Sequence, residues 1–300
     1  MSSNTQPIID VALVHHLVAS QFPRWADLYV RPVARCGWDN RTFHLGEQMV
    51  VRLPSGQAYA SQVEREQRWL PVLAPKLPLS IPEPVAMGEP DKVFPWKWSI
   101  YRWIAGEPAD PANIVSLPAF AMNLAQFLLA LQRIDSTGGP QPGSDNFYRG
   151  GSLLAYDRET REAIHALGEQ IDGETATQVW QAGIEALWTA PSVWVHGDVS
   201  AGNLLITEGR LSAVIDFGQL AVGDPACDLA ITWTMFDAKN REAFRKMLHL
   251  DAGTWARGRA WALWKSLIIA AKIADTNAIE GKQCWSTIEK VLAEHRQGEA

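Results

Sequence analysis

Hydrophobic positions in the first hundred residues follow helical spacing and then strand spacing. A helix is predicted after Asp10, whose side chain suits an N-cap, and it ends before Pro23; its apolar face comprises Val11, Val14, Leu17 and Val18. Strands are predicted at 30–34, 42–45, 49–53 and 98–104. A Gly-Glu turn joins the second and third strands into a hairpin, and a helix is predicted at 61–73. This part of the chain therefore indicates a small antiparallel sheet with helices.

After Gly106 the pattern changes to long helical periods. Helices are predicted at 117–134, 153–169, 175–188, 226–236, 241–250, 255–274 and 285–296. A short strand-rich region at 193–215 interrupts them. We therefore expect an α+β protein with two lobes: an N-terminal sheet lobe of residues 1–105 and a larger, mainly helical lobe of residues 106–300.

Composition and charge agree with an ordinary globular protein. The chain has 300 residues, 47% hydrophobic and 20% charged, and its formal net charge is −6. A general nucleic-acid binder is not expected, because a phosphate backbone calls for a basic surface. The charge divides between the lobes, at +2 for residues 1–105 and −8 for residues 106–300. An acidic second lobe suits a cationic or metal-nucleotide ligand, and it also suits a solvated surface without a ligand.

The remaining composition indicates a reduced, cytoplasmic protein. Cys36, Cys227 and Cys284 lie far apart without metal-ligand spacing, so neither a disulfide framework nor a zinc site is predicted. Residues 1–7 lack the pattern of a signal peptide, and the longest apolar run, 260–271, is interrupted by Lys265. No membrane partner is expected, and the oligomeric state stays open. The 14 tryptophans are mostly expected in the core; Trp38 and Trp103 are the ones that could instead stack on a ligand.

Three polar residues in the strand-rich region carry the chemistry. An apolar strand leads into a loop with Asp198, Asn203 begins the next strand, and a third strand ends at Asp216. The two arms of one hairpin can place Asn203 and Asp216 side by side as oxygen ligands of a hard divalent ion. Asp198 can then orient a hydroxyl group and accept its proton. Phosphoryl transfer needs this set, namely metal ligands to neutralise phosphates and one carboxylate to align the nucleophile.

The motifs around these residues resemble those of the aminoglycoside phosphotransferase family. They read His196-Gly-Asp198 with Asn203 five residues later, then Asp216-Phe217-Gly218, then Gly223-Asp224-Pro225 with Asp228 after it. The resemblance extends over nearly the whole chain and implies a protein-kinase-like fold. It implies that Asp198 is the catalytic base, that Asn203 and Asp216 bind Mg²⁺, and that His196 and Asp228 support the catalytic loop. Asp224 is expected to form a turn or helix cap.

The N-terminal lobe contains candidates for the nucleotide phosphates. A kinase needs a phosphate loop, a cation on the third strand and a helix acid that holds the cation. Candidates for the loop are Gly37, Asp39 and Asn40, in a segment with one glycine where three are usual. Arg52 stands where a lysine is usual. Glu66 shares the apolar face of its helix and is the expected acid, with Glu64 as the alternative.

The segment 99–104 resembles the kinase hinge. Its backbone groups at Arg102, Trp103 and Ile104 are expected to hydrogen-bond the purine of ATP or GTP. Together these features predict a Mg²⁺-dependent small-molecule O-phosphotransferase, whose hydroxyl-bearing acceptor could be an aminoglycoside-type antibiotic. The alternatives are a nucleotide-binding pseudokinase, a Ser/Thr protein kinase and a metal hydrolase. Arg52 motivates the pseudokinase, while the short spacing after Asp216 disfavours a protein kinase and missing ligand clusters disfavour a hydrolase.

Overall fold

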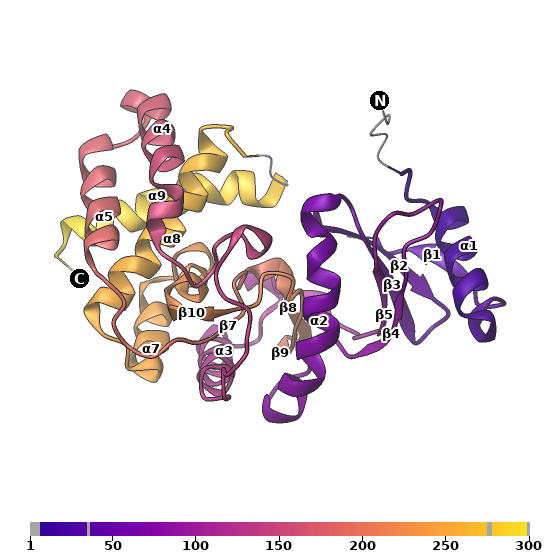
Figure 1. Ribbon diagram of the computed structural model, residues 1–300. Coiled ribbons are helices and arrows are strands. Elements are labelled where there is room, and N and C mark those ends of the chain that lie inside the picture. Colours follow the sequence, from indigo (N-terminus) through magenta and orange to yellow (C-terminus); the bar gives the residue numbers. More distant parts are fainter. Residues whose placement is uncertain (1–6, 35–36, 275–277, 299–300) are drawn as a thin grey trace. The chain divides into compact units, whose positions relative to one another are not determined.

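The computed structural model describes residues 7–34, 37–274 and 278–298, so Cys36 and most of the segment 1–7 lie outside the described residues. The chain divides into two compact units, each described by itself below (Figure 1). The first comprises Met1–Ala105 and Ala213–Gln219, and the second comprises Gly106–Ser212 and Leu220–Ala300. Residues 213–219 thus belong to the first unit, whereas the sequence pattern had placed them in the helical lobe. The reason is that Val214 and the following turn bond to residues of the first unit, beginning with the Val214 N–H to the Ser80 carbonyl (3.0 Å).

The first unit contains a five-stranded antiparallel sheet in the order β1-β2-β3-β5-β4. Its strands are β1 (Val30–Pro32), β2 (Asn40–Leu45), β3 (Met49–Pro54), β4 (Pro84–Gly88) and β5 (Trp98–Arg102). The predicted hairpin is confirmed, with Leu45 opposite Met49 across its turn. Strand β4 was missed, because its prolines suggested a connection; Pro84 is tolerated there since it is the first residue of an edge strand.

Two helices cover opposite faces of this sheet (Figure 1). Helix α1 (Val11–Gln21) begins as predicted at Asp10, whose carboxylate accepts the Leu13 N–H at 2.9 Å. Its buried residues pack with alternate residues of β3 and β5, including Val51 and Ile100. Helix α2 (Ala60–Leu73) lies on the other face. Because strand side chains alternate, Arg52 and Tyr101 point toward α2, and this face becomes the polar one.

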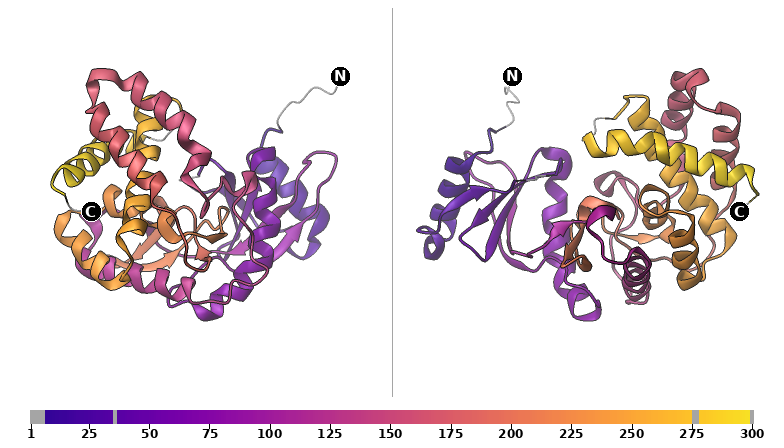
Figure 2. Two further views of the ribbon diagram at one scale, coloured as in Figure 1. Left: turned by 60° about the vertical axis from the view of Figure 1, so that its left-hand side comes forward. Right: turned by 180° about the vertical axis from the view of Figure 1, so that it is seen from behind.

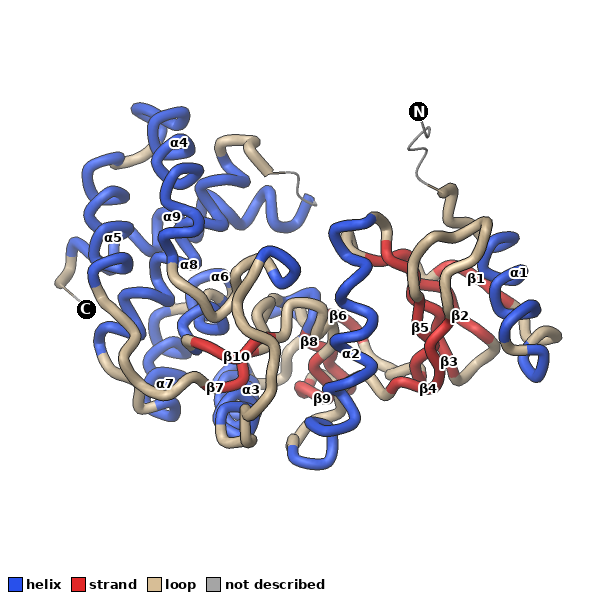
Figure 3. The backbone as a smooth tube through the Cα atoms, viewed as in Figure 1, coloured by secondary structure: helices blue, strands red, loops and turns tan. Residues whose placement is uncertain are grey.

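The second unit is mainly helical, with two small sheets (Figure 3). Its helices are α3 (Leu117–Gln132), α4 (Asp157–Leu167), α5 (Gly173–Glu185), α6 (Ile231–Thr234), α7 (Ala238–Leu248), α8 (Ala252–Ala270) and α9 (Ala278–Arg296). Strands β7 (Val193–Val195) and β10 (Ala221–Gly223) pair antiparallel, and β6 (Glu107–Pro108), β8 (Leu204–Thr207) and β9 (Arg210–Val214) form the other sheet. The single helix predicted at 226–236 is a 3₁₀ turn, Pro225–Leu229, followed by α6.

Helix α8 is the central element of the second unit and packs against α4, α5 and α9 (Figure 2). Glu294, a buried carboxylate of helix α9, connects this helix to its neighbours. It pairs with Arg259 at 2.9 Å and with Arg241. It also accepts the Trp233 indole N–H at 2.9 Å. Many tryptophans are core residues, as expected; Trp180, Trp194 and Trp233 are fully buried. Within the described ranges, no helix has the length and hydrophobicity needed to cross a membrane.

Candidate active site

The loop after β7 is held by a buried carboxylate. Both oxygens of Asp228 accept backbone N–H groups, one from His196 and one from Gly197, each at 2.8 Å. Nδ1 of the buried His196 in turn accepts the N–H of Asp198 at 3.2 Å. Burial raises the pKa of Asp228, although the hydrogen bonds from the Gly197 and His196 N–H groups oppose the shift. The loop backbone that leads to Asp198 is therefore fixed from both sides.

Asp198 projects from this loop as a partly exposed carboxylate. The side-chain amide of Asn203 donates to the backbone oxygen of Asp198 at 2.9 Å and to its Oδ2 at 3.0 Å. Nζ of Lys265 lies 3.7 Å from Oδ1. Burial would raise the pKa of Asp198, but the charges of Lys265 and Arg149 outweigh it and leave this pKa below its ordinary value. The carboxylate is consequently ionised at neutral pH and able to accept a proton.

In the first unit, Arg52 connects two carboxylates. Nη1 of Arg52 lies 3.2 Å from Glu66 Oε1, and Nη2 lies 2.9 Å from Asp216 Oδ1. Burial would lower the pKa of the guanidinium, but the two carboxylates together raise it well above its ordinary value. Glu64, the alternative acid, instead pairs with Lys97 at 2.5 Å and is largely exposed. The planar fork of arginine suits this double contact better than an ammonium group does.

Glu66 is also held by two further donors. Oε1 accepts the backbone N–H of Phe217 at 3.0 Å, and Oε2 accepts the hydroxyl of Tyr101. Burial and the neighbouring Glu66 raise the pKa of Tyr101 well above its ordinary value, so its hydroxyl stays protonated as a donor. The buried Glu66 thereby links β3, β5 and the segment 216–217 within the first unit.

The backbone around Asp216 has an unusual conformation. Asp216 has a φ of 67°, in the left-handed region of backbone conformation that residues other than glycine seldom adopt. Gly218 follows at a close approach, because a Cβ placed there would lie 2.6 Å from the side chain of Gln62. The carbonyl oxygen of Gly218 accepts from Arg65. Two features thus stabilise this turn: the absence of a side chain at Gly218, which permits the close approach of Gln62, and the ion pair of Asp216 with Arg52.

Asn203 and Asp216 have the oxygen donors that Mg²⁺ prefers. The amide nitrogen of Asn203 faces Asp198, so its carbonyl oxygen is turned away from that carboxylate. Asn203 belongs to the second unit and Asp216 to the first. Their placement side by side therefore stays a prediction. Among the described residues no group of three or more His, Cys, Asp or Glu side chains could hold a metal.

The predicted phosphate loop is described from Gly37 onward. The carboxylate of Asp39 accepts from Gln62 at 3.0 Å, and its carbonyl accepts the Ser55 N–H at 2.8 Å. Asn40 is buried at the start of β2. An added Cβ at Gly37 would meet no atom within 4 Å. Within the first unit, therefore, nothing in the surroundings of Gly37 requires a glycine.

The hinge segment has fewer available N–H groups than the sequence indicates. The N–H of Arg102 donates to the Glu83 carbonyl at 3.0 Å, and that of Trp103 donates to the Gln48 carbonyl at 2.8 Å. In the described part of the chain, the N–H of Ile104 has no such partner. Trp103 is partly exposed, and its ring lies 4.5 Å from that of His44. Of the three predicted hinge N–H groups, two are therefore already bonded to backbone carbonyls.

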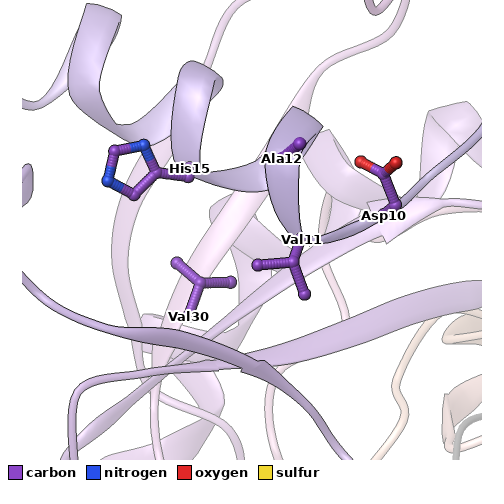
Figure 4. A pocket seen from close by; sticks show the side chains of 5 residues that line it. All are labelled: Asp10, Val11, Ala12, His15 and Val30. Atoms are coloured by element: carbon purple, nitrogen blue, oxygen red, sulfur yellow. The ribbon is translucent and has the colours of Figure 1, made fainter.

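Asp224 has the structural role that the sequence predicts. Asp224 caps the 3₁₀ turn through the Ala226 N–H at 3.1 Å, as expected, and also pairs with Arg257 at 2.6 Å. A hollow on the first unit is lined by Asp10, Val11, Ala12, His15 and Val30 (Figure 4). It contains none of the predicted site residues.

Two cations next to Asp198 were not singled out from the sequence. The only signal was the interruption of an apolar helix by Lys265. Arg149 lies in a polar loop without a recognisable motif.

Comparisons with known proteins assign the family. A profile of the phosphotransferase enzyme family matches residues 30–261, and the chain belongs to this family. An aminoglycoside 3'-phosphotransferase of Escherichia coli is 43% identical over 67 residues, which are 22% of this chain and 25% of that protein. One of Salmonella typhimurium is 34% identical over 113 residues, which are 37% of this chain and 41% of that protein. These matches span less than half the length of either relative.

Solved structures extend the similarity to the whole fold. Aminoglycoside 2'-phosphotransferase-IIIa in complex with GDP has a TM-score of 0.70 and 16% identity, covering 96% of this chain and all of that one (100%). Macrolide 2'-phosphotransferase type I has a TM-score of 0.61 and 18% identity, covering 94% of this chain and 98% of that one. The predicted α+β, kinase-like fold with a small sheet part and a larger helical part is confirmed, and so is the family.

Proposed function

We propose that the protein transfers the γ-phosphoryl group of ATP or GTP to a hydroxyl group of a small molecule in a Mg²⁺-dependent reaction. The observation that carries this proposal is the state of Asp198. It is an ionised carboxylate, oriented by Asn203 and placed on a loop that Asp228 fixes. Family membership supports the same reaction class.

Asp198 is proposed to act as the base. The acceptor hydroxyl oxygen attacks the γ-phosphorus, a new O–P bond forms, and the bond from the γ-phosphorus to the bridging oxygen breaks. The hydroxyl proton passes to the Asp198 carboxylate, and the nucleoside diphosphate leaves with the bond electrons. A positioned general base contributes about 10²–10⁴-fold to the rate. The amide of Asn203 keeps Asp198 oriented during this transfer.

Asn203 and Asp216 are proposed to hold Mg²⁺, which when bound would neutralise charge on the phosphates. The Arg52 fork, held by Glu66, is proposed to contact the phosphates. Gly37, Asp39 and Asn40 would border them. At the hinge, the carbonyl of Arg102 and the N–H of Ile104 are proposed to bind the purine.

ATP and GTP are both proposed as phosphoryl donors. Solved relatives have been captured with GDP and, in another aminoglycoside phosphotransferase, with ATP and streptomycin. The aminoglycoside-type acceptor raised by the sequence is one candidate. The ammonium group of Lys265 beside Asp198 favours an acidic acceptor.

The test is a nucleotide-turnover assay with a panel of hydroxyl compounds, Mg²⁺, and ATP or GTP. Asp198→Asn should keep nucleotide binding and lose acceptor-dependent release of ADP or GDP by about 10²-fold or more. Asp110→Asn is the matched control, because Asp110 is an exposed cap residue of the same unit and asparagine can replace it as a cap. Full turnover in Asp198→Asn would eliminate the assigned base.

Asp216→Ala should weaken nucleotide binding only when Mg²⁺ is present. An unchanged dependence on Mg²⁺ would eliminate its role as a ligand. If the protein binds nucleotide but no acceptor in a chemically broad panel stimulates turnover, the pseudokinase alternative is favoured. Turnover with a Ser- or Thr-containing peptide would favour a protein kinase.

A further inference from the structure

A lysine from the central helix lies beside the proposed base. Lys265 belongs to α8, most of whose side chains from Trp255 to Ile268 are buried. Its Nζ lies 3.7 Å from Asp198 Oδ1, and the lysine side chain keeps about a third of its surface exposed (33%). This is a loose ion pair between two partly exposed groups. An acceptor that brings its hydroxyl to Asp198 therefore arrives next to an ammonium group.

A second cation, Arg149, is placed next to the same carboxylate by aromatic side chains. Its guanidinium lies 5.0 Å from the ring centroids of both Trp261 and Trp264. The ring of Trp264 also packs against that of Tyr156, with the ring centroids 4.0 Å apart. Stacking of a guanidinium on indole faces restricts its orientation. Burial opposes the shift, but the charge of Arg149, after that of Lys265, helps to lower the pKa of Asp198.

The loop that presents Arg149 is unusually well fixed. Phe147 and Tyr148 have φ values of 52° and 51°, which is strained for bulky residues. The hydroxyl of Tyr156 donates to the carbonyl of Phe147, and the carbonyl of Gly150 accepts the Asp224 N–H at 2.8 Å. A Cβ at Gly150 would lie 3.1 Å from Val195, the last residue of β7. The structure thus maintains a strained loop immediately beside the strand that leads to Asp198.

We propose that Arg149 and Lys265 bind an anionic group of the acceptor, a carboxylate or a phosphate ester, so that the substrate is an acidic hydroxy compound. The inference rests on the proposed phosphotransferase function. A guanidinium fork and an ammonium group are the usual partners of such anions, and they repel a polycation. The net negative charge of the helical lobe is a sum over all its residues, whereas the ammonium group beside the Asp198 carboxylate is positive.

The test uses four defined probes and the enzyme loaded with Mg²⁺ and ADP, so that the nucleotide phosphate positions are filled. The probes are glycerate, glycerol 3-phosphate, neutral glycerol and the polycation kanamycin. Binding is measured by calorimetry at constant ionic strength. We expect at least one of the two acids to bind more tightly than glycerol and kanamycin. The better acid distinguishes a carboxylate ligand from a phosphate ester.

The variants Arg149→Met and Lys265→Met should each weaken that binding by about ten-fold or more, because each removes a charge-assisted contact. Arg149→Lys and Lys265→Arg should recover part of it and show that the fold is intact. Arg158→Met and Lys246→Met are the matched controls; they remove the same charges from exposed positions of α4 and α7, and should change binding little.

Several outcomes would overturn the inference. These are equal binding of glycerol, tighter binding of kanamycin, no binding of either acid, or equal losses in the control variants. If Arg149→Met and Lys265→Met raised the Kd for the nucleotide but not the Kd for either acid, the two cations would be assigned to nucleotide binding. That result would also overturn the inference. Failure to bind Mg²⁺ and ADP at all would instead refute the proposed function, so the two failures are distinguishable.

Discussion

Replacement of Asp228 by asparagine should destabilise the protein and displace the loop that carries Asp198. The carboxylate accepts two buried N–H groups at 2.8 Å each. An asparagine amide can accept only one of them with its oxygen and turns its NH₂ toward the other, which leaves a buried donor unpaired. Such a loss costs about 1–3 kcal/mol, and hydrogen bonds to charged groups lie at the upper end.

The cost of burying the charge of Asp228 reduces the expected loss of stability, because asparagine does not carry that charge. The pKa of Asp228 is raised by burial, so the two N–H groups and His196 do not fully offset the cost of burying its charge. A neutral amide avoids that cost. We therefore expect Asp228→Asn to lower the free energy of unfolding by about 2 kcal/mol, with a larger effect on kcat than on the KM for nucleotide.

Urea unfolding followed by circular dichroism at pH 7, together with steady-state kinetics, tests this expectation. Glu242→Gln is the control, since Glu242 is exposed and pairs with the exposed Lys246 at 3.0 Å; the free energy of unfolding of this variant should differ by less than about 0.5 kcal/mol. If Asp228→Asn unfolded at the same urea concentration as the unmodified protein and kept its kcat, the assignment of Asp228 as the support of this loop would be refuted.

Three further predictions concern stability. Arg52→Met leaves the buried Glu66 and the partly exposed Asp216 without their shared cation and should destabilise the protein by about 3–5 kcal/mol in urea unfolding, with Arg52→Lys recovering part; an unchanged midpoint would contradict this. Gly218→Ala drives a methyl group into Gln62 and should lower stability by about 1–3 kcal/mol in thermal unfolding, whereas Gly202→Ala, where a Cβ meets nothing within 4 Å, should not. Asp251→Ala removes the N-cap of α8 and should cost about 1 kcal/mol at pH 7. Hydrogen bonds from Thr254 hold the pKa of Asp251 below its ordinary value. This stabilisation is thus present above the ordinary pKa and is lost as the pH falls through the folded one; a difference that stayed constant in acid would contradict the assignment.

Local patterns were sufficient to predict the elements that build the site. The helical position of Glu66 relative to Val63 and Leu70 placed it on the buried face, and the structure pairs it with Arg52. Spacing in a helix or strand determines the direction of a side chain, so short motifs in regular elements can be interpreted directly.

Features that depend on distant contacts could not be predicted in this way. The N–H groups of Arg102 and Trp103 are occupied by carbonyls from two separate segments, which no local pattern reveals. Arg149 is placed by indoles more than a hundred residues away in the sequence. Strand β4 was missed because its residues resemble a proline-rich connection, and pairing with β5 overrides that preference.

The membership of Ala213–Gln219 in the first unit has a consequence for synthesis on the ribosome. Chains are made from the N-terminus and domains generally fold as units, but this unit receives one of its pieces only after the first half of the second unit has been made. Until Gln219 has emerged, Arg52 lacks Asp216 and the buried Glu66 lacks the N–H of Phe217. The nascent first unit therefore exists for more than a hundred residues of elongation with its polar face incomplete. A fragment ending at residue 105 would share this defect, so neither truncation nor transplantation of that unit should yield a stable product.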